Sequence, residues 1–483
     1  MIDGDEEDEV IIAIGDVAEN ENAGGLSHGF DDEDAGHDGK IGEMAREEWL
    51  IRSDIFDAQD PFRIHFKDAV NEQHGVTMRQ NAPDLINIQI WHGAPGIITT
   101  VSSTQIPTLK WAEREMPRFQ KLLRAMVEVE SPSDDKAAVD RFGALLADTV
   151  CGDAEVKLVP GGKWGKHVIC RFGKKKRGGK QVLVLGHGDT VWPMGTLRTM
   201  PFREGEGRLW GPGVLDMKGG LCVFLFAMRA ARELGLPVPD SVVLQVNSDE
   251  EVGSPSSRGL TEENARKSAA VLVMEPGTGL EGKLKTERKG VGGFRVSVTG
   301  RASHAGVDFE RGASAVLELA RQIERISGWT DLERGVTVNA GVIGGGTKSN
   351  VVAAAAWVEV DFRVRKLADA GRLERKFRAL RAVDSRCGIA VTGGLNRPPM
   401  VRSAGVRRLF GMAAAAGKEF GMVVEESATG GGSDGNFTAA LGVPTLDGLG
   451  CVGEGAHAVN ESIVLDRVPE RIALLAGMLG RLI

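Results

Sequence analysis

Short apolar runs alternate along much of the chain with segments whose apolar residues recur at helical spacing. The runs QVLVLGH (181–187), SVVLQVNS (241–248) and AAVLVME (269–275) are predicted as strands, with helices between and around them. Apolar strands that alternate with helices indicate an α/β fold whose largely parallel sheet is covered by helices on both faces. The predicted helices of this part are 110–131, 134–150, 217–235, 261–268, 404–420 and 468–482, and a further strand is predicted at 443–450.

The pattern changes between about residues 289 and 398. There the order is strand, helix, strand, strand, helix, strand, which is the ferredoxin-like βαββαβ arrangement. We therefore expect a catalytic domain that is interrupted by an inserted lid or dimerisation domain. The elements of the insert are predicted at 292–300, 313–326, 335–343, 354–364, 367–383 and 388–393.

Charge and composition divide the rest of the chain. Residues 1–40 contain 14 acidic residues and one lysine, so they carry −13, and the remaining residues carry +5 of the total −8. This acidic segment is predicted to be a disordered tail, and residues 41–105, which show no clear period, an extension of unknown structure. The expected domains are a catalytic domain in two parts, 106–287 and 400–483, and a lid domain at 288–399.

Several classes of protein are excluded by what the sequence lacks. No apolar run approaches the ~18 residues of a membrane span and no secretory signal is recognisable, so a cytoplasmic location is expected. The five cysteines lack the CxxC spacing of a thiolate metal site. The basic cluster Lys174–Arg177 lies between the strand-like runs 167–172 and 181–187, and we interpret it as a solvated hairpin turn, not a nucleic-acid signal.

Acidic and imidazole side chains gather where the predicted strands end. Because the carboxyl ends of parallel strands meet at one edge of a sheet, we expect these side chains to share one crevice. Imidazole and carboxylate donors suit Zn²⁺, with Co²⁺ or Mn²⁺ as alternatives. They are too many for a single ion with an open position, and they fit two ions that share a bridging carboxylate. The candidates are His187, Asp189, Asp216, Glu250, Glu251, Glu275 and His457.

The adjacent residues Glu250 and Glu251 suggest a division of labour at this crevice. One of them would bind metal while the other stays free to carry a proton. The residue pattern alone leaves open which glutamate has which role.

The motifs HGDTV, GPGVLDMKGG, DEEVGSPSSR, MEP and GRASHAG resemble those of the M20 family of di-zinc metallopeptidases and deacylases. The likeness extends from about residue 106 to residue 483 and is strongest to bacterial glutamate carboxypeptidases of the carboxypeptidase G2 type. It implies that Asp216 bridges two zinc ions. It further implies that Glu250 is the general base and that Asp189 holds the ring of a metal-binding histidine. The remaining ligands implied are His187 and Glu275 for one ion and Glu251 and His457 for the other.

The same resemblance assigns residues of the lid and of a late loop to the substrate. His304 corresponds to the residue that stabilises the oxyanion, which dimeric members supply from the other subunit. Asn350 and Arg363 match positions that hold the substrate carboxylate or the oxyanion, and the arginine fork suits a carboxylate. The loop TGGGSDGN (429–436) resembles the family's substrate loop, and its candidate contacts are Gly431, Gly432 and Ser433.

The function implied is that of a zinc-dependent exopeptidase that hydrolyses an amide bond beside a free carboxylate and releases C-terminal glutamate. One alternative is an N-acyl-amino-acid deacylase of the acetylornithine deacetylase or succinyl-diaminopimelate desuccinylase type. An alternative of another class is a non-catalytic metal-binding scaffold. The expected partners are a small molecule or short peptide with a free carboxylate and a second copy of the chain, bound through the lid, with no nucleic acid and no membrane. Whether His304 acts within its own chain or across the dimer is left open.

Overall fold

The computed structural model describes residues 105–174 and 180–482 and, before them, four strands. The chain divides into two units, Met1–Ser103 and Thr104–Ile483. In the first unit β1 (Val10–Ile11) pairs antiparallel with β2 (Leu50–Ile51), and β3 (Gly75–Ala82) pairs antiparallel with β4 (Leu85–Trp91). The rest of the expected acidic tail and extension, and most of the basic cluster, lie outside the described residues.

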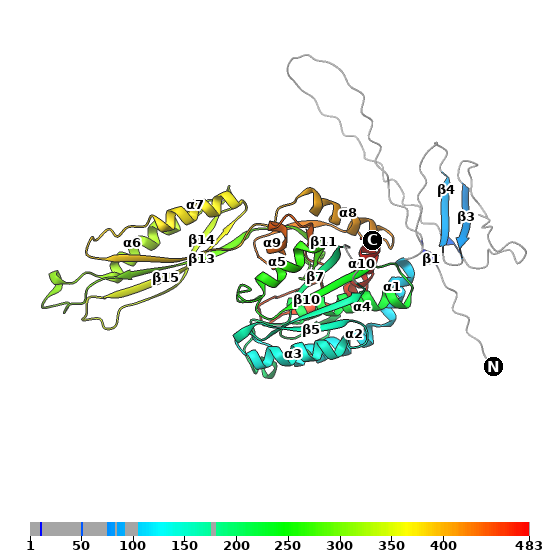
Figure 1. Ribbon diagram of the computed structural model, residues 1–483, viewed down its shortest axis with the longest axis horizontal. Helices are drawn as coiled ribbons and strands as arrows, with labels where there is room; N and C mark the ends of the chain where they lie inside the picture. The colour runs from blue at the N-terminus through cyan, green and yellow to red at the C-terminus, as the bar shows by residue number, and fades with distance from the viewer. Residues whose placement is uncertain are drawn as a thin grey trace, which may run out of the picture. The chain divides into compact units, whose positions relative to one another are not determined.

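A six-stranded sheet with the order β18-β11-β7-β10-β6-β5 forms the centre of the second unit (Figure 1). The strands from β18 to β10 are parallel, β6 pairs antiparallel with β10, and β5 pairs antiparallel with β6. The predicted α/β fold is therefore confirmed. The strands are β5 (Glu155–Pro160), β6 (Lys166–Gly173), β7 (Gln181–His187), β10 (Ser241–Asn247), β11 (Ser268–Val273) and β18 (Thr445–Leu446).

Helices cover this sheet on both faces because its central strands are apolar on both sides. In β7, Val182 and Val184 belong to the larger core, while Leu183 and Leu185 belong to a second core that includes Ala265 of α5. The helices of this domain are α1 (Gln105–Arg114), α2 (Met116–Glu128), α3 (Lys136–Thr149), α4 (Gly219–Glu233), α5 (Arg258–Arg266), α8 (Ala404–Lys418), α9 (Gly435–Ala440) and α10 (Val468–Gly480).

Several local predictions differ from the structure: the strand predicted at 443–450 is only Thr445–Leu446, the helix predicted at 367–383 ends at Arg378, and three further differences have a clear cause. The helix predicted at 110–131 is two helices, because Pro117 lacks a backbone N–H and starts a new helix in its first turn. The helix predicted to begin at Met217 begins at Gly219, since the backbone of Asp216 and Met217 is not helical. The hairpin predicted around Lys174–Arg177 is wrong: β10 lies between β6 and β7, so those two strands are not partners.

The lid domain is a four-stranded antiparallel sheet with the order β14-β15-β13-β16 and two helices, α6 and α7. Its chain order is the predicted βαββαβ, and it has its own core, in which Phe377 stacks on Phe294 with ring centroids 4.1 Å apart. The inserted lid fold is confirmed. Its elements are β13 (Gly290–Thr299), α6 (Ala315–Ser327), β14 (Thr337–Gly345), β15 (Ala355–Val364), α7 (Leu367–Arg378) and β16 (Gly388–Arg397).

Two smaller sheets position the remaining loops. A four-stranded sheet has the order β19-β20-β9-β8, and a parallel pair joins β12 to β17 where the chain enters the lid domain. Among the described residues, no helix has the length and apolar character that crossing a bilayer would demand. The strands are β8 (Arg203–Gly205), β9 (Arg208–Trp210), β12 (Leu284–Arg288), β17 (Glu426–Thr429), β19 (Gly453–Glu454) and β20 (Ser462–Val464).

Candidate active site

Two groups of potential metal ligands meet at the carboxyl edge of the central sheet. One contains His187, Asp216 and Glu275, the other Asp216, Glu251 and His457, and the ligand atoms of each group lie within 4.8 Å of one another. Asp216 belongs to both groups. Its Oδ1 is 3.1 Å from Nε2 of His187 and its Oδ2 is 3.4 Å from Nε2 of His457, so each oxygen faces one group.

The order of the strands explains why these residues converge. His187 is the last residue of β7, Glu251 follows β10, and Glu275 follows β11, which are three adjacent parallel strands. Asp216 lies in the tight non-helical turn before α4, and His457 lies in the loop between β19 and β20. The ligands are therefore supplied by five separate segments.

Several features of the two groups fit divalent cations. Oε1 of Glu251 is buried and, among the described residues, has no hydrogen-bond partner, which is costly unless a cation contacts it. Hydrogen bonds to Asp216 and Glu251 raise the pKa of His457 to about 10. Burial and the charge of Asp216 raise the pKa of Glu275 to about 7. In the metal-free protein these groups thus hold protons where imidazole and carboxylate ligands would bind a cation.

Asp189 lies against the His187 ring with both its main chain and its carboxylate. Nδ1 of His187 is 2.9 Å from the backbone oxygen of Asp189 and 3.6 Å from its Oδ1, so the main chain makes the closer contact with the ring. The buried carboxylate accepts from Ser133 Oγ at 2.7 Å and from the backbone nitrogens of Glu250 and Glu251, both at 3.2 Å. Asp189 therefore links the end of β7 to the loop after β10.

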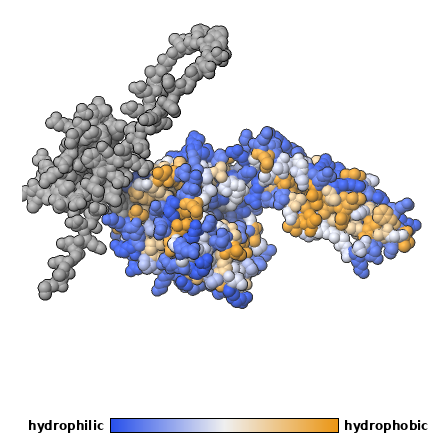
Figure 2. Space-filling model, turned by 180° about the vertical axis from the view of Figure 1, so that it is seen from behind, coloured by the Kyte–Doolittle hydropathy of each residue, from blue (hydrophilic) through white to orange (hydrophobic). Residues whose placement is uncertain are grey.

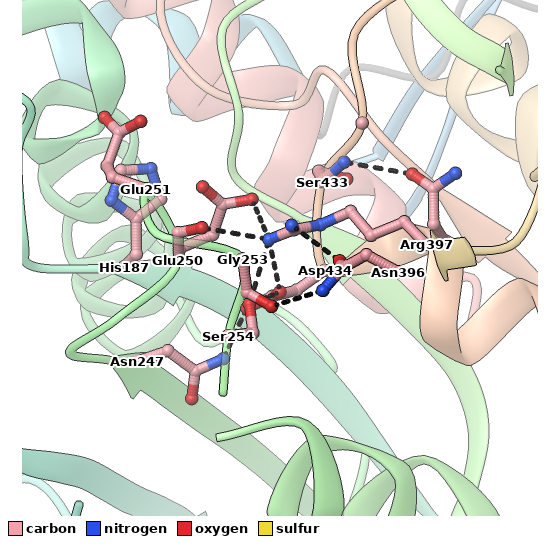
Figure 3. Close-up of polar contacts among 12 residues, drawn as sticks. His187, Asn247, Glu250, Glu251, Gly253, Ser254, Asn396, Arg397, Ser433 and Asp434 are labelled. Carbon is pink, nitrogen blue, oxygen red and sulfur yellow. Dashed lines mark hydrogen bonds and ion pairs between the residues drawn. The ribbon is translucent and has the colours of Figure 1, made fainter. Parts of the chain in front are cut away.

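Glu250 belongs to neither ligand group. Its Oε1 accepts a hydrogen bond from Nη2 of Arg397 at 2.7 Å (Figure 3). Burial raises the pKa of Glu250 well above its usual value, and the charge of Arg397 opposes this shift. An unligated carboxyl with a raised pKa beside a metal site has the properties of a general base.

A carboxylate that the sequence did not reveal holds the turn containing Asp216. Glu461 is fully buried and accepts from the backbone nitrogens of Gly213, Leu215 and Asp216 at 2.9–3.0 Å and from Nε1 of Trp192 at 2.8 Å. Its position four residues after His457 was the only sequence signal, and that spacing has no meaning before the fold is known.

A cavity of about 770 Å³ lies between the metal-ligand edge and the lid domain. Glu250, Glu251 and His457 line it from one side, and Arg363, Gly431 and Gly432 are among its other lining residues. One edge of the Arg363 guanidinium is held by Asp361 at 2.9 and 3.0 Å, and its Nη1 is 3.5 Å from the backbone oxygen of Gly430.

Three of the predicted substrate residues do not line this cavity. Ser433 is buried and donates to Oδ2 of Asp447 at 2.6 Å. His304 and Asn350 are exposed neighbours on the lid domain, where the backbone nitrogen of Ala305 donates to the oxygen of Asn350 at 3.0 Å.

A buried ion pair holds the backbone of the loop TGGGSDGN (429–436), and the sequence did not indicate this pair either. Arg288 binds both carboxylate oxygens of Asp447 at 2.7 and 2.8 Å. Its Nη1 donates to the backbone oxygens of Gly431 and Gly432 at 3.1 and 3.2 Å. The partners are 159 residues apart in sequence, so no local pattern could have indicated the pair.

The α/β sheet with its convergent ligand groups and inserted βαββαβ domain defines the architecture of a metal-dependent hydrolase. The chain belongs to Peptidase family M20/M25/M40, which it matches over residues 183–481. It is 30% identical over 382 residues to carboxypeptidase G2 of Pseudomonas sp. (strain RS-16), covering 76% of this chain and 90% of that protein. The predicted family and the predicted metallopeptidase class are confirmed.

Two further similarities accompany this match. It is 27% identical over 269 residues to acetylornithine deacetylase of Salmonella arizonae, covering 51% of this chain and 68% of that protein. The crystal structure of aminopeptidase PepT from Bacillus cereus has a TM-score of 0.62 and 21% identity, covering 77% of this chain and 98% of that one. The structural likeness shows the fold alone.

Proposed function

We propose that this protein is a zinc-dependent exopeptidase that hydrolyses an amide bond beside a free carboxylate and releases C-terminal glutamate. The observation that carries this proposal is the arrangement of two ligand groups around Asp216 next to the unligated Glu250, in a cavity that Arg363 also lines. The similarity to carboxypeptidase G2 over most of both chains supports the same substrate class.

Each residue of the site has a defined task in this proposal. His187, Glu275, Glu251 and His457 would hold two zinc ions with Asp216 between them. The ions would supply Lewis acidity that polarises the scissile carbonyl and lowers the pKa of a water molecule. Glu250 takes a proton from the attacking water and returns it to the leaving nitrogen. Asp189 keeps the loop of Glu250 and Glu251 against the end of β7 through its two backbone hydrogen bonds.

Substrate binding is assigned to the opposite side of the cavity. A substrate carboxylate would be bound by Arg363, whose planar fork can reach both oxygens. Gly431 and Gly432 let the backbone approach the ligand closely, because they carry no side chain. Because Asp361 occupies only the Nε side of the guanidinium, its other side stays open to the carboxylate of a substrate.

An N-acyl-amino-acid deacylase is the second candidate, and the similarity to acetylornithine deacetylase favours it. Both functions use the same ligands, so the substrate decides between them. Purified protein should hydrolyse folate-type or N-acyl-glutamate substrates faster than N-acetylornithine, and a chelator should abolish turnover. Faster hydrolysis of N-acetylornithine would favour the deacylase, and no chelator-sensitive turnover on any of these substrates would favour a non-catalytic metal-binding scaffold.

We also propose that the protein forms a homodimer through the lid domain. Figure 2 shows apolar side chains gathered on the surface of this domain, and β14 is an edge strand on which Val342 and Ile343 are 52% and 64% exposed. Exposed edge strands and apolar patches are typical of protein interfaces. A dimer would also explain why His304 lies outside the cavity of its own chain, because it would act in the cavity of the partner subunit.

A further inference from the structure

The chain leaves the lid domain through a buried arginine that contacts the proposed base. Arg397 is the last residue of β16, and its side chain is 8% exposed. Nη2 is 2.7 Å from Oε1 of Glu250, 3.0 Å from the Glu250 backbone oxygen, 2.9 Å from Ser254 Oγ and 3.2 Å from Asp434 Oδ1 (Figure 3). Nη1 donates to Oδ1 of the neighbouring Asn396 at 3.2 Å, and Nε has no partner among the described residues, so it is Nη2 that contacts the loop carrying Glu250.

Asp434 anchors the other side of this arginine. Its Oδ1 also accepts from Ser254 Oγ, and its Oδ2 accepts from Nδ2 of Asn247, the last residue of β10, both at 2.5 Å. The guanidinium thus lies between two carboxylates, one fixed to the central sheet and one belonging to the proposed base. Its position is set by the sheet, so it can in turn set the position of Glu250.

The preceding residue strengthens this connection between the lid strand and the loop. Nδ2 of Asn396 donates to the backbone oxygen of Gly253 at 3.0 Å. Two consecutive residues of β16 therefore bind the segment 250–254. Among the described residues, no side chain other than Arg397 donates a hydrogen bond to the carboxylate of Glu250.

We propose that Arg397 is a positioning residue, which holds the carboxylate of Glu250 in its working orientation from the last strand of the lid domain. This inference rests on the proposed role of Glu250 as general base. A general base acts only within hydrogen-bond reach of the proton that it removes. Without Arg397 the Glu250 side chain gains rotational freedom and faces the carboxylate of Asp434 without a cation between them.

The test compares Arg397→Gln with a control variant, Arg402→Gln. Arg402 lies five residues further along the chain, is exposed and pairs with Glu426. Arg397→Gln should lower kcat about 10²-fold and leave KM within about threefold, since a 1 Å misplacement of a reacting group costs on this order. Zinc content, measured by elemental analysis, should stay equal to that of the wild type. Arg402→Gln should match the wild type in all three.

A double mutant separates positioning from a general structural effect. If Arg397 acts through Glu250, Arg397→Gln should cause no further loss of kcat in a Glu250→Gln background. Arg397→Lys keeps a buried cation, so its kcat should fall only about tenfold. If Arg397→Gln does not fold, Arg397→Lys replaces it in the double-mutant comparison with Glu250→Gln.

Three results would overturn the inference: kinetics of Arg397→Gln and Arg397→Lys equal to those of Arg402→Gln, an effect on KM alone, or full additivity in the double mutant. If Glu250→Gln itself retained full turnover, the proposed base would be wrong, and the inference would fall with it. Loss of turnover in Glu250→Gln together with full turnover in Arg397→Gln would remove the inference and leave the proposed function intact.

Discussion

The turn that carries Asp216 depends on Glu461, and a single amide substitution measures how strongly. Oε1 of Glu461 accepts from the nitrogens of Leu215 and Asp216, and Oε2 accepts from Gly213 N and Trp192 Nε1. Glu461→Gln keeps the shape of the side chain and replaces one acceptor oxygen by an NH₂ group. Whichever way the amide is turned, one buried donor and one partly buried donor lose their acceptor and face another donor.

The magnitude follows from these two donors. An unsatisfied buried donor costs about 1–3 kcal/mol and a partly buried one costs less, so Glu461→Gln should lower the free energy of unfolding by about 1–4 kcal/mol. Because Asp216 N is one of the four donors, the Asp216 carboxylate, which we propose to lie between the two ions, should also lose its fixed position. Zinc affinity should then fall about 10–100-fold, as is typical when a partner of a ligand is removed.

Urea unfolding of the chelator-treated protein, followed by circular dichroism, gives the first quantity, and zinc titration gives the second. The matched control is Glu454→Gln on β19, which pairs with the strand directly after Glu461; the Glu454 side chain is 52% exposed and pairs with Arg208. The control should change stability by less than about 0.5 kcal/mol. If Glu461→Gln were as stable as the control and bound zinc equally well, the turn would not depend on Glu461 and the reasoning would be refuted.

Three further predictions follow from the same site. Glu250→Gln should keep its zinc while turnover falls about 10²–10⁴-fold, whereas Glu251→Gln should lose zinc. If elemental analysis found the reverse pattern, Glu251 would be the base and Glu250 the metal ligand. Zinc affinity should weaken as the pH falls from about 8 to 6, because the protonated His457, with a pKa of about 10, and Glu275, with a pKa of about 7, must release protons on binding. Calorimetry in buffers of different ionisation enthalpy measures that release, and a pH-independent affinity would contradict it. If His304 acts across the dimer, refolding Glu250→Gln chains together with His304→Ala chains should restore about a quarter of wild-type activity. Random pairing yields about half mixed dimers, and each of these has one working site. No recovery despite verified mixing would mean that His304 does not act in the site of the partner subunit.

Local patterns were sufficient for the central strands of the sheet, for the elements of the lid domain and for choosing the metal-ligand candidates. The consecutive apolar residues Val182 to Leu185 predict that strand β7 is buried on both faces, and in the structure they pack into two separate cores. His187 and Glu275 follow apolar strands, and parallel strands bring such residues to one edge, so the convergence could be predicted from the strands alone. The βαββαβ order of the lid domain could likewise be read from the succession of its elements.

Contacts between distant segments could not be predicted in this way. Arg397 and Glu250 are 147 residues apart, and Glu461 is 245 residues from Asp216. Whether such residues meet depends on strand order, which local spacing does not encode. The same limit explains the wrong hairpin at Lys174–Arg177, because two consecutive strands with a turn-like linker can still have a third strand between them.

Zinc analysis of Asp216→Ala tests the central claim most directly, because Asp216 is the one residue shared by both ligand groups. Each group would keep only two of its three protein ligands, fewer than the three that catalytic zinc sites generally use. Elemental analysis of the purified wild type should find about two zinc ions per chain, Asp216→Ala should retain close to none, and His457→Ala should lose mainly one. A fully active wild type with one ion or none, or an Asp216→Ala variant that keeps both, would contradict the account.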